Sequence, residues 1–113
     1  MEHEMRLNPE PFRMIQSGQK TIELRLYDEK RRRIRVGDTI AFTETETGER
    51  MRVIVTDLHV FPTFSELYRA LPLEKCGYTE ADLDTASPDD MLAYYALEQQ
   101  QKYGAVGIGI ARM

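Results

Sequence analysis

The residues with the clearest chemical potential lie close together, between Gly18 and Arg25. A strand through this stretch would place Glu23 and Arg25 on the same face, because side chains two positions apart point the same way. They could form an ion pair, or hold a ligand between an acceptor and a donor. Lys20 could act as a base only after losing its proton, and a nearby carboxylate opposes that loss. We therefore expect a charged Lys20 that contacts a phosphate or carbonyl, with Glu23 as the possible base; an ordinary surface ion pair is the alternative.

A basic segment, residues 30–35, follows the Gly18–Arg25 stretch. Positions 20 to 35 carry a net charge of +4, although the whole chain of 113 residues carries −4. The overall charge argues against nucleic-acid binding by bulk attraction, whereas a local basic patch on an acidic body suits an anionic ligand. Tyr27 is a candidate surface for base stacking, and the side chain of Thr21 could form a hydrogen bond with a polar edge of the ligand. The candidate phosphate contacts are Lys30, Arg31, Arg32 and Arg33. The alternative is a solvated loop.

The first half of the chain is expected to be rich in strands. Alternating apolar residues, or flanking turn signals, predict them at 3–7, 20–27, 39–43 and 50–60, with a hairpin tip near 47–49. Asn8 and Pro9 begin a helix that Gly18 ends. The strand at 50–60 is long enough to need a bulge or bend, as in a sheet that curls into a barrel.

The second half is expected to alternate short helices with one last strand. Thr63 and Glu66 have capping-box spacing, so a helix should run to about Leu71. A short helix is expected from Thr79, and one longer helix from Ser87 to about Gly104. Residues 106–111 form an apolar final strand. This order predicts one α+β domain over residues 1–113, a small curled or closed β-barrel flanked by helices.

The pattern Gly18-x-Lys20-x-x-Glu23-x-Arg25 resembles the GxKxxExR signature of the ASCH family, whose fold is a PUA-like barrel. The order of predicted elements agrees over nearly the whole chain. The resemblance implies RNA or nucleotide binding in a basic cleft beside the motif. Some small members are hydrolases: one removes the acetyl group of acetylcytidine, and another is a metal-assisted ribonuclease.

The match to the amidohydrolase is incomplete. Its catalytic lysine corresponds to Lys20, but Glu23 stands where that enzyme has a threonine, and Glu74 is the nearest candidate for its glutamate. The resemblance therefore favours binding over amide hydrolysis, with Lys20, Glu23 and Glu74 as the residues that catalysis would use.

Other features narrow the classes of function. Cys76 is the single cysteine, which excludes an internal disulfide, and no metal or cofactor site is predicted. No apolar run is long enough to cross a bilayer and no secretory leader is recognisable, so a cytoplasmic protein is expected. The acidic second half could instead dock a basic protein partner.

Overall fold

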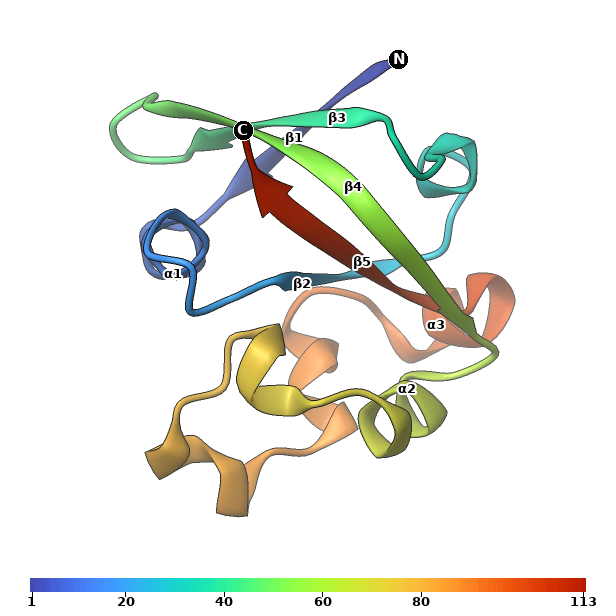
Figure 1. Ribbon diagram of the computed structural model, residues 1–113. Coiled ribbons are helices and arrows are strands. Elements are labelled where there is room, and N and C mark those ends of the chain that lie inside the picture. Colours follow the sequence, from blue (N-terminus) through green and yellow to red (C-terminus); the bar gives the residue numbers. More distant parts are fainter.

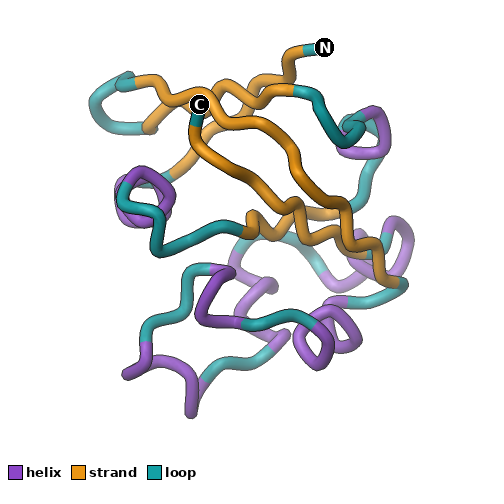
Figure 2. The backbone as a smooth tube through the Cα atoms, viewed as in Figure 1, coloured by secondary structure: helices purple, strands orange, loops and turns teal.

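The computed structural model describes residues 1–113 and contains one curled sheet of five strands (Figures 1 and 2). The strand order is β1-β3-β4-β5-β2. The β1–β3 pair is parallel and the other pairs are antiparallel. The strands are β1 (Glu2–Leu7), β2 (Ile22–Leu26), β3 (Thr39–Glu44), β4 (Arg50–Phe61) and β5 (Ala105–Arg112). The predicted α+β fold with a curled sheet is confirmed, and β1 and β2 form its two edges.

The bend predicted in the long fourth strand is also present. The pairing of β4 with β5 shifts between Val55 and Asp57, which is a β-bulge. A bulge increases the local twist and bends its strand. In Figure 1, β4 curves across the molecule and brings the start of α2 beneath the sheet.

The helices are short. The α-helices are α1 (Pro9–Gln16), α2 (Phe64–Ala70) and α3 (Leu97–Tyr103). Four 3₁₀ helices span Arg31–Arg33, Leu73–Cys76, Glu80–Thr85 and Pro88–Ala93. As predicted, Thr63 caps α2, because its hydroxyl accepts the backbone N–H of Glu66 at 3.1 Å. No helix combines the length and the apolar character that crossing a membrane requires.

The single helix expected from Ser87 to Gly104 is wrong. The chain forms the 3₁₀ helix Pro88–Ala93, breaks, and restarts as α3 at Leu97. Ala96 is extended, and the Gln99 side chain accepts its N–H at 3.2 Å, which starts a new helix. The break lets Met91 be buried while Tyr95 stacks on Phe64, with 6.3 Å between ring centroids. Tertiary packing therefore overrides the local helical pattern.

Two apolar clusters lie on opposite sides of β2. The larger fills the curled sheet beneath α1 and includes Phe12, Phe42 and Ile108. The smaller joins the even positions of β2, Ile22, Leu24 and Leu26, to α2 and to the segment from Leu73 to Tyr95. The predicted apolar face of β2 is confirmed, and its opposite face holds Glu23 and Arg25.

Candidate functional site

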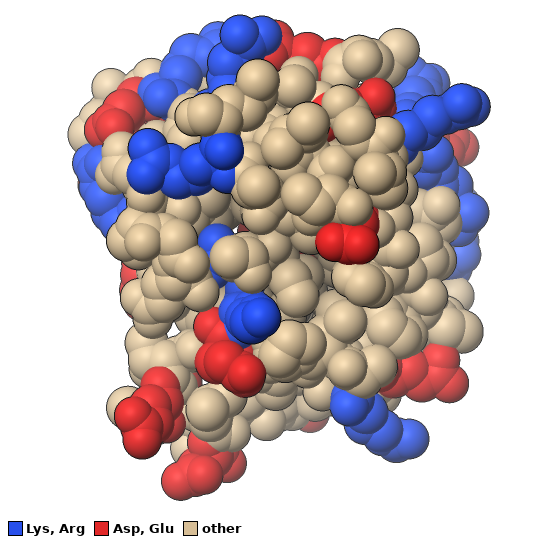
Figure 3. Space-filling model, in the orientation of Figure 1, with Lys and Arg blue, Asp and Glu red and all other residues tan.

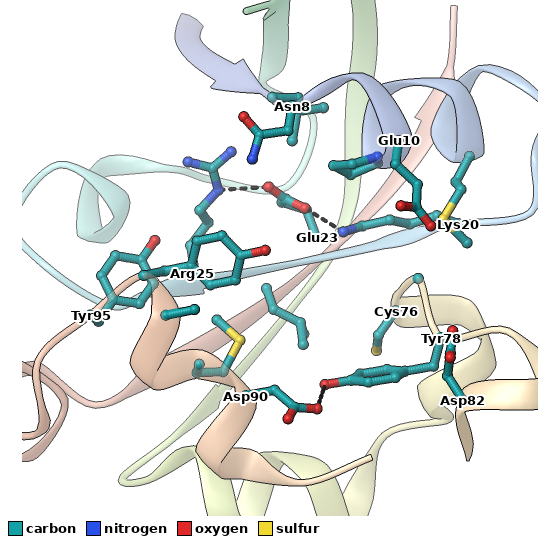
Figure 4. Close-up of a pocket in the computed structure, with 18 of the residues that line it drawn as sticks. Asn8, Glu10, Lys20, Glu23, Arg25, Cys76, Tyr78, Asp82, Asp90 and Tyr95 are labelled. Carbon is teal, nitrogen blue, oxygen red and sulfur yellow. Dashed lines mark hydrogen bonds and ion pairs between the residues drawn. The ribbon is translucent and has the colours of Figure 1, made fainter. Parts of the chain in front are cut away.

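A cleft of about 800 Å³ separates β2 and α1 from the 3₁₀-helical segment below them (Figure 4). Residues far apart in the sequence line it: Asn8 and Glu10 at α1, the charged residues of β2, and Tyr78 and Asp90 on the opposite side. The cleft lies beside the Gly18–Arg25 stretch.

Three side chains form one ion triad on the β2 wall. Lys20 Nζ lies 2.8 Å from Glu23 Oε1, and Arg25 Nε lies 2.6 Å from Glu23 Oε2. Glu23 is 3% exposed and Lys20 is 8% exposed. One carboxylate is thus shared by two cations, which leaves the ion triad with a net charge of +1.

The two cations of the ion triad lower the pKa of Glu23. Burial by itself would raise the pKa of Glu23, but the positive charges of Lys20 and Arg25, and the hydrogen bonds they donate, lower the pKa below its ordinary value. Glu23 is therefore ionised at neutral pH. Lys20 donates one N–H to the Glu23 carboxylate and has two more N–H groups for a ligand.

Gly77 packs closely against the Lys20 side chain. It has a φ of +109°, and a Cβ built there would lie 3.2 Å from Lys20 Cδ and 3.5 Å from Nζ. A larger side chain would be strained and would press on the lysine. The neighbouring Cys76 is buried, and burial raises the pKa of its thiol to about 11. This thiol is protonated at neutral pH and is a poor nucleophile.

A chain of hydroxyl groups lines the opposite wall. The Tyr78 hydroxyl donates to Asp90 Oδ2 at 2.7 Å and lies 2.6 Å from the Tyr68 hydroxyl. Burial, followed by the hydrogen bonds to Tyr68 and Asp90, raises the pKa of Tyr78 far above its ordinary value. We call Tyr68, Tyr78 and Asp90 the Tyr-Asp network. Figure 4 shows Tyr78 and Asp90 across the cleft from Lys20, Glu23 and Arg25.

The structure brings together only part of the predicted site. Lys20, Glu23 and Arg25 line the cleft. Thr21 and Glu74 do not: the backbone N–H of Thr21 donates to the Lys75 carbonyl at 2.9 Å, and Glu74 is exposed on the 3₁₀ helix Leu73–Cys76. Glu74 is therefore not among the groups that surround Lys20 in this cleft.

The basic segment, residues 30–35, and Tyr27 also lie outside the cleft lining. The Arg32 guanidinium stacks over the Tyr27 ring at 4.3 Å, and Arg31 pairs with Asp28 at 2.8 Å. Arg33 is exposed. Figure 3 shows basic side chains along the right margin, where Figure 1 places the segment before β3.

Two of the predicted ligand-binding cations donate to backbone carbonyls of the edge strand β1. Arg25 donates to the Arg6 carbonyl at 2.8 Å, and Lys30 donates to the Glu4 carbonyl at 2.7 Å. Both carbonyls belong to β1, which is an edge strand. The backbone N–H and C=O groups on its outer side have no neighbouring strand to pair with. Arg25 therefore links β2 to β1, the two edges of the sheet, and Lys30 links the turn after β2 to β1. Arg25 thus contributes to the fold as well as to the cleft.

The cleft is not basic as a whole. Its lining carries three cationic side chains and four carboxylates, and the positive charge is concentrated near β2. These residues are Arg6, Lys20, Arg25, Glu10, Glu23, Asp82 and Asp90. Sequence reasoning missed the Tyr-Asp network, because no pattern along the chain indicates that Tyr78 meets Asp90 twelve positions later.

Solved structures provide comparisons for this geometry. The hypothetical protein PH0355 is 35% identical with a TM-score of 0.83, and each chain covers 100% of the other. PF0455 from Pyrococcus furiosus is 36% identical with a TM-score of 0.73, over 100% of this chain and 98% of that one. No curated protein matches the chain at a significant level.

A more distant structure shares the fold alone. A mutant form of ZmASCH from Zymomonas mobilis is 16% identical with a TM-score of 0.65, over 97% of this chain and 67% of that one. The family described as ASCH domain matches residues 5–112, nearly the full length. This match shows that the chain belongs to the ASCH domain family, and the curled five-stranded sheet agrees with it.

Proposed function

We propose that this protein binds a nucleobase in the cleft, carried by a nucleotide or by an unpaired residue of an RNA. The observation that carries the proposal is Lys20, a buried cation that faces the cleft and has two N–H groups beyond its ion pair. A buried donor of this kind gains from an acceptor that displaces water, such as a ring carbonyl or a phosphate oxygen.

Aromatic side chains at the cleft support a planar ligand. Tyr94 lines the cleft and is 67% exposed, so its ring is available for stacking. Tyr95 also lines the cleft, and its ring is fixed by its stack on Phe64. Stacking a base on an aromatic side chain is worth about 1–3 kcal/mol and tolerates any base. Lys20 and Tyr94 would then supply polar and stacking contacts to one ring.

The chemistry of the cleft supports binding more than amide hydrolysis. Lys20 Nζ donates to the Glu23 carboxylate at 2.8 Å, which positions it as a hydrogen-bond donor to a ligand and not as an acceptor of a proton. Glu23 is itself neutralised by two cations and is a weak base. Cys76 is protonated, and Glu74 is outside the cleft lining.

For an RNA ligand, the basic segment would supply contacts to the backbone beyond the cleft. Arg33 and Arg35 are exposed and have no ion-pair partner. Contacts of this type are independent of sequence and weaken as salt rises. RNA binding would then depend on salt more steeply than the binding of a single nucleotide.

A charge-removing variant of Lys20 tests the proposal. We expect Lys20→Met to weaken the binding of nucleoside 5′-monophosphates by about tenfold or more, because a hydrogen bond from a charged donor is lost. The matched control is Lys75→Met, which removes an exposed lysine outside the cleft lining. Isothermal titration calorimetry with the four common monophosphates and a short single-stranded RNA measures both variants. Equal affinities for Lys20→Met and the wild type, or no binding by the wild type, would refute the proposal.

A further inference from the structure

The wall of the cleft that faces Lys20 has a defined hydrogen-bonding polarity. The single proton of the Tyr78 hydroxyl goes to Asp90 Oδ2, because a carboxylate can only accept. The Tyr68 hydroxyl must therefore donate to Tyr78. Both hydroxyl protons of the Tyr-Asp network are donated within the network, so the network can offer only hydrogen-bond acceptors to a ligand.

Asp90 is the strongest of these acceptors. Its Oδ2 accepts the Tyr78 hydroxyl at 2.7 Å and the Ser87 N–H at 3.2 Å, while its Oδ1 has no partner. Asp90 lines the cleft and its carboxylate is accessible. The Tyr78 hydroxyl also holds this carboxylate in place, which reduces the ordering cost of binding a ligand.

The two walls of the cleft therefore have opposite preferences. Lys20 and Arg25 offer donors and a net positive charge, whereas Asp90 offers an acceptor and a negative charge across the opening (Figure 4). A ligand that spans the cleft satisfies both walls only if one end accepts hydrogen bonds and the other end donates them.

We infer that the cleft is selective for a base that carries both an oxo group and an exocyclic amino group, namely guanine or cytosine. This inference rests on the proposed function. The oxo group accepts from Lys20 and the amino group donates to Asp90. A carboxylate is a suitable acceptor for an exocyclic amino group of a base.

Close analogues that lack the amino group would bind less well. Uracil has a second oxo group where cytosine has its amino group, so two acceptors would face each other at Asp90. Hypoxanthine is guanine without the amino group, so the Asp90 carboxylate would lose its water without gaining a partner. An unpaired polar group at a binding site is the strongest source of such discrimination.

The test compares matched ligand pairs, with Asp90→Asn as the variant. We expect the wild type to bind GMP over IMP, and CMP over UMP, by about tenfold or more. Asparagine has nearly the same shape as aspartate, and its oxygen can still accept from the Tyr78 hydroxyl, so the fold is retained. The variant presents an uncharged amide to the cleft in place of the carboxylate. We expect both affinity ratios to fall toward one in Asp90→Asn. The control is Asp89→Asn on the same 3₁₀ helix, because Asp89 is exposed and outside the cleft lining.

Affinity ratios are the informative readout, because removing a negative charge shifts the affinity for every monophosphate together. Wild-type ratios near one, with Lys20-dependent binding of all four ligands, would overturn this inference and leave the proposed function standing. Unchanged GMP-to-IMP and CMP-to-UMP affinity ratios in Asp90→Asn would also overturn this inference. If the wild type bound none of the four ligands, the proposed function and this inference would fall together.

Discussion

Replacing Glu23 with glutamine is expected to lower the free energy of unfolding by about 3–5 kcal/mol, the cost of removing one partner from a buried ion pair. Glu23 is 3% exposed and contacts both Lys20 and Arg25. Without its carboxylate, two cations would remain close together with no counter-charge. Urea unfolding of the variant and the wild type measures the loss.

Lys20→Met is the informative comparison for this prediction. It leaves Glu23 paired with Arg25 and brings the net charge of the ion triad from +1 to zero. We therefore expect it to destabilise the fold less than Glu23→Gln does. The opposite order, or a Glu23→Gln variant as stable as the wild type, would show that the ion triad does not hold the cleft wall together.

The same ion triad predicts a pH dependence. The pKa of Glu23 is lower in the folded protein than its ordinary value of 4.5, so its contribution to stability is fully present above about pH 4.5. That contribution is lost as the pH falls through the folded pKa. The stability of Glu23→Gln should consequently vary less than that of the wild type over this acidic range.

Gly104→Ala is the second substitution with a large expected effect. Gly104 ends α3 with φ +77° and ψ −165°, a region that is essentially restricted to glycine. An added Cβ would lie 2.8 Å from the Phe61 carbonyl oxygen, which belongs to the backbone. Gly104 cannot shift freely, because its carbonyl accepts the Tyr27 N–H and its N–H donates to the Gln100 carbonyl. We expect a loss of more than about 2 kcal/mol, measured by chemical unfolding.

Gly48→Ala is the matched control for that prediction. Gly48 has a nearly equal φ of +76°, but nothing lies within 4 Å of an added Cβ. The difference between the two variants isolates the clash with Phe61 and the more restricted backbone at Gly104. Equal losses in both would contradict a close backbone approach at the junction of α3 and β5.

The sequence predicted the strands well because their signals are local. Alternation in β2 separated Ile22 and Leu24 from Glu23 and Arg25, and the structure keeps that division. The bulge in β4 was predicted from length alone, and the cap of α2 from the spacing of Thr63 and Glu66. In each of these elements, the residues that decide the structure are close together in the chain.

The features that the sequence did not predict depend on distant contacts. The break after Ala93 allows Tyr95 to reach Phe64, which is thirty-one positions earlier. The pairing of Tyr78 with Asp90 depends on how two 3₁₀ helices fold over β2. For Lys30, an interaction with solvent or phosphate was expected, but it donates to the Glu4 carbonyl across the open edge of the sheet.

The most direct test of the central claim is where a ligand perturbs the backbone amides. In a two-dimensional NMR titration of the isotope-labelled protein with a nucleoside monophosphate, we expect the largest shift changes at residues 20–25, 76–78 and 90–95, which surround the cleft. Changes confined to residues 30–35, or spread over β4 without any at Lys20, would contradict the claim that the ion triad forms the ligand-binding wall.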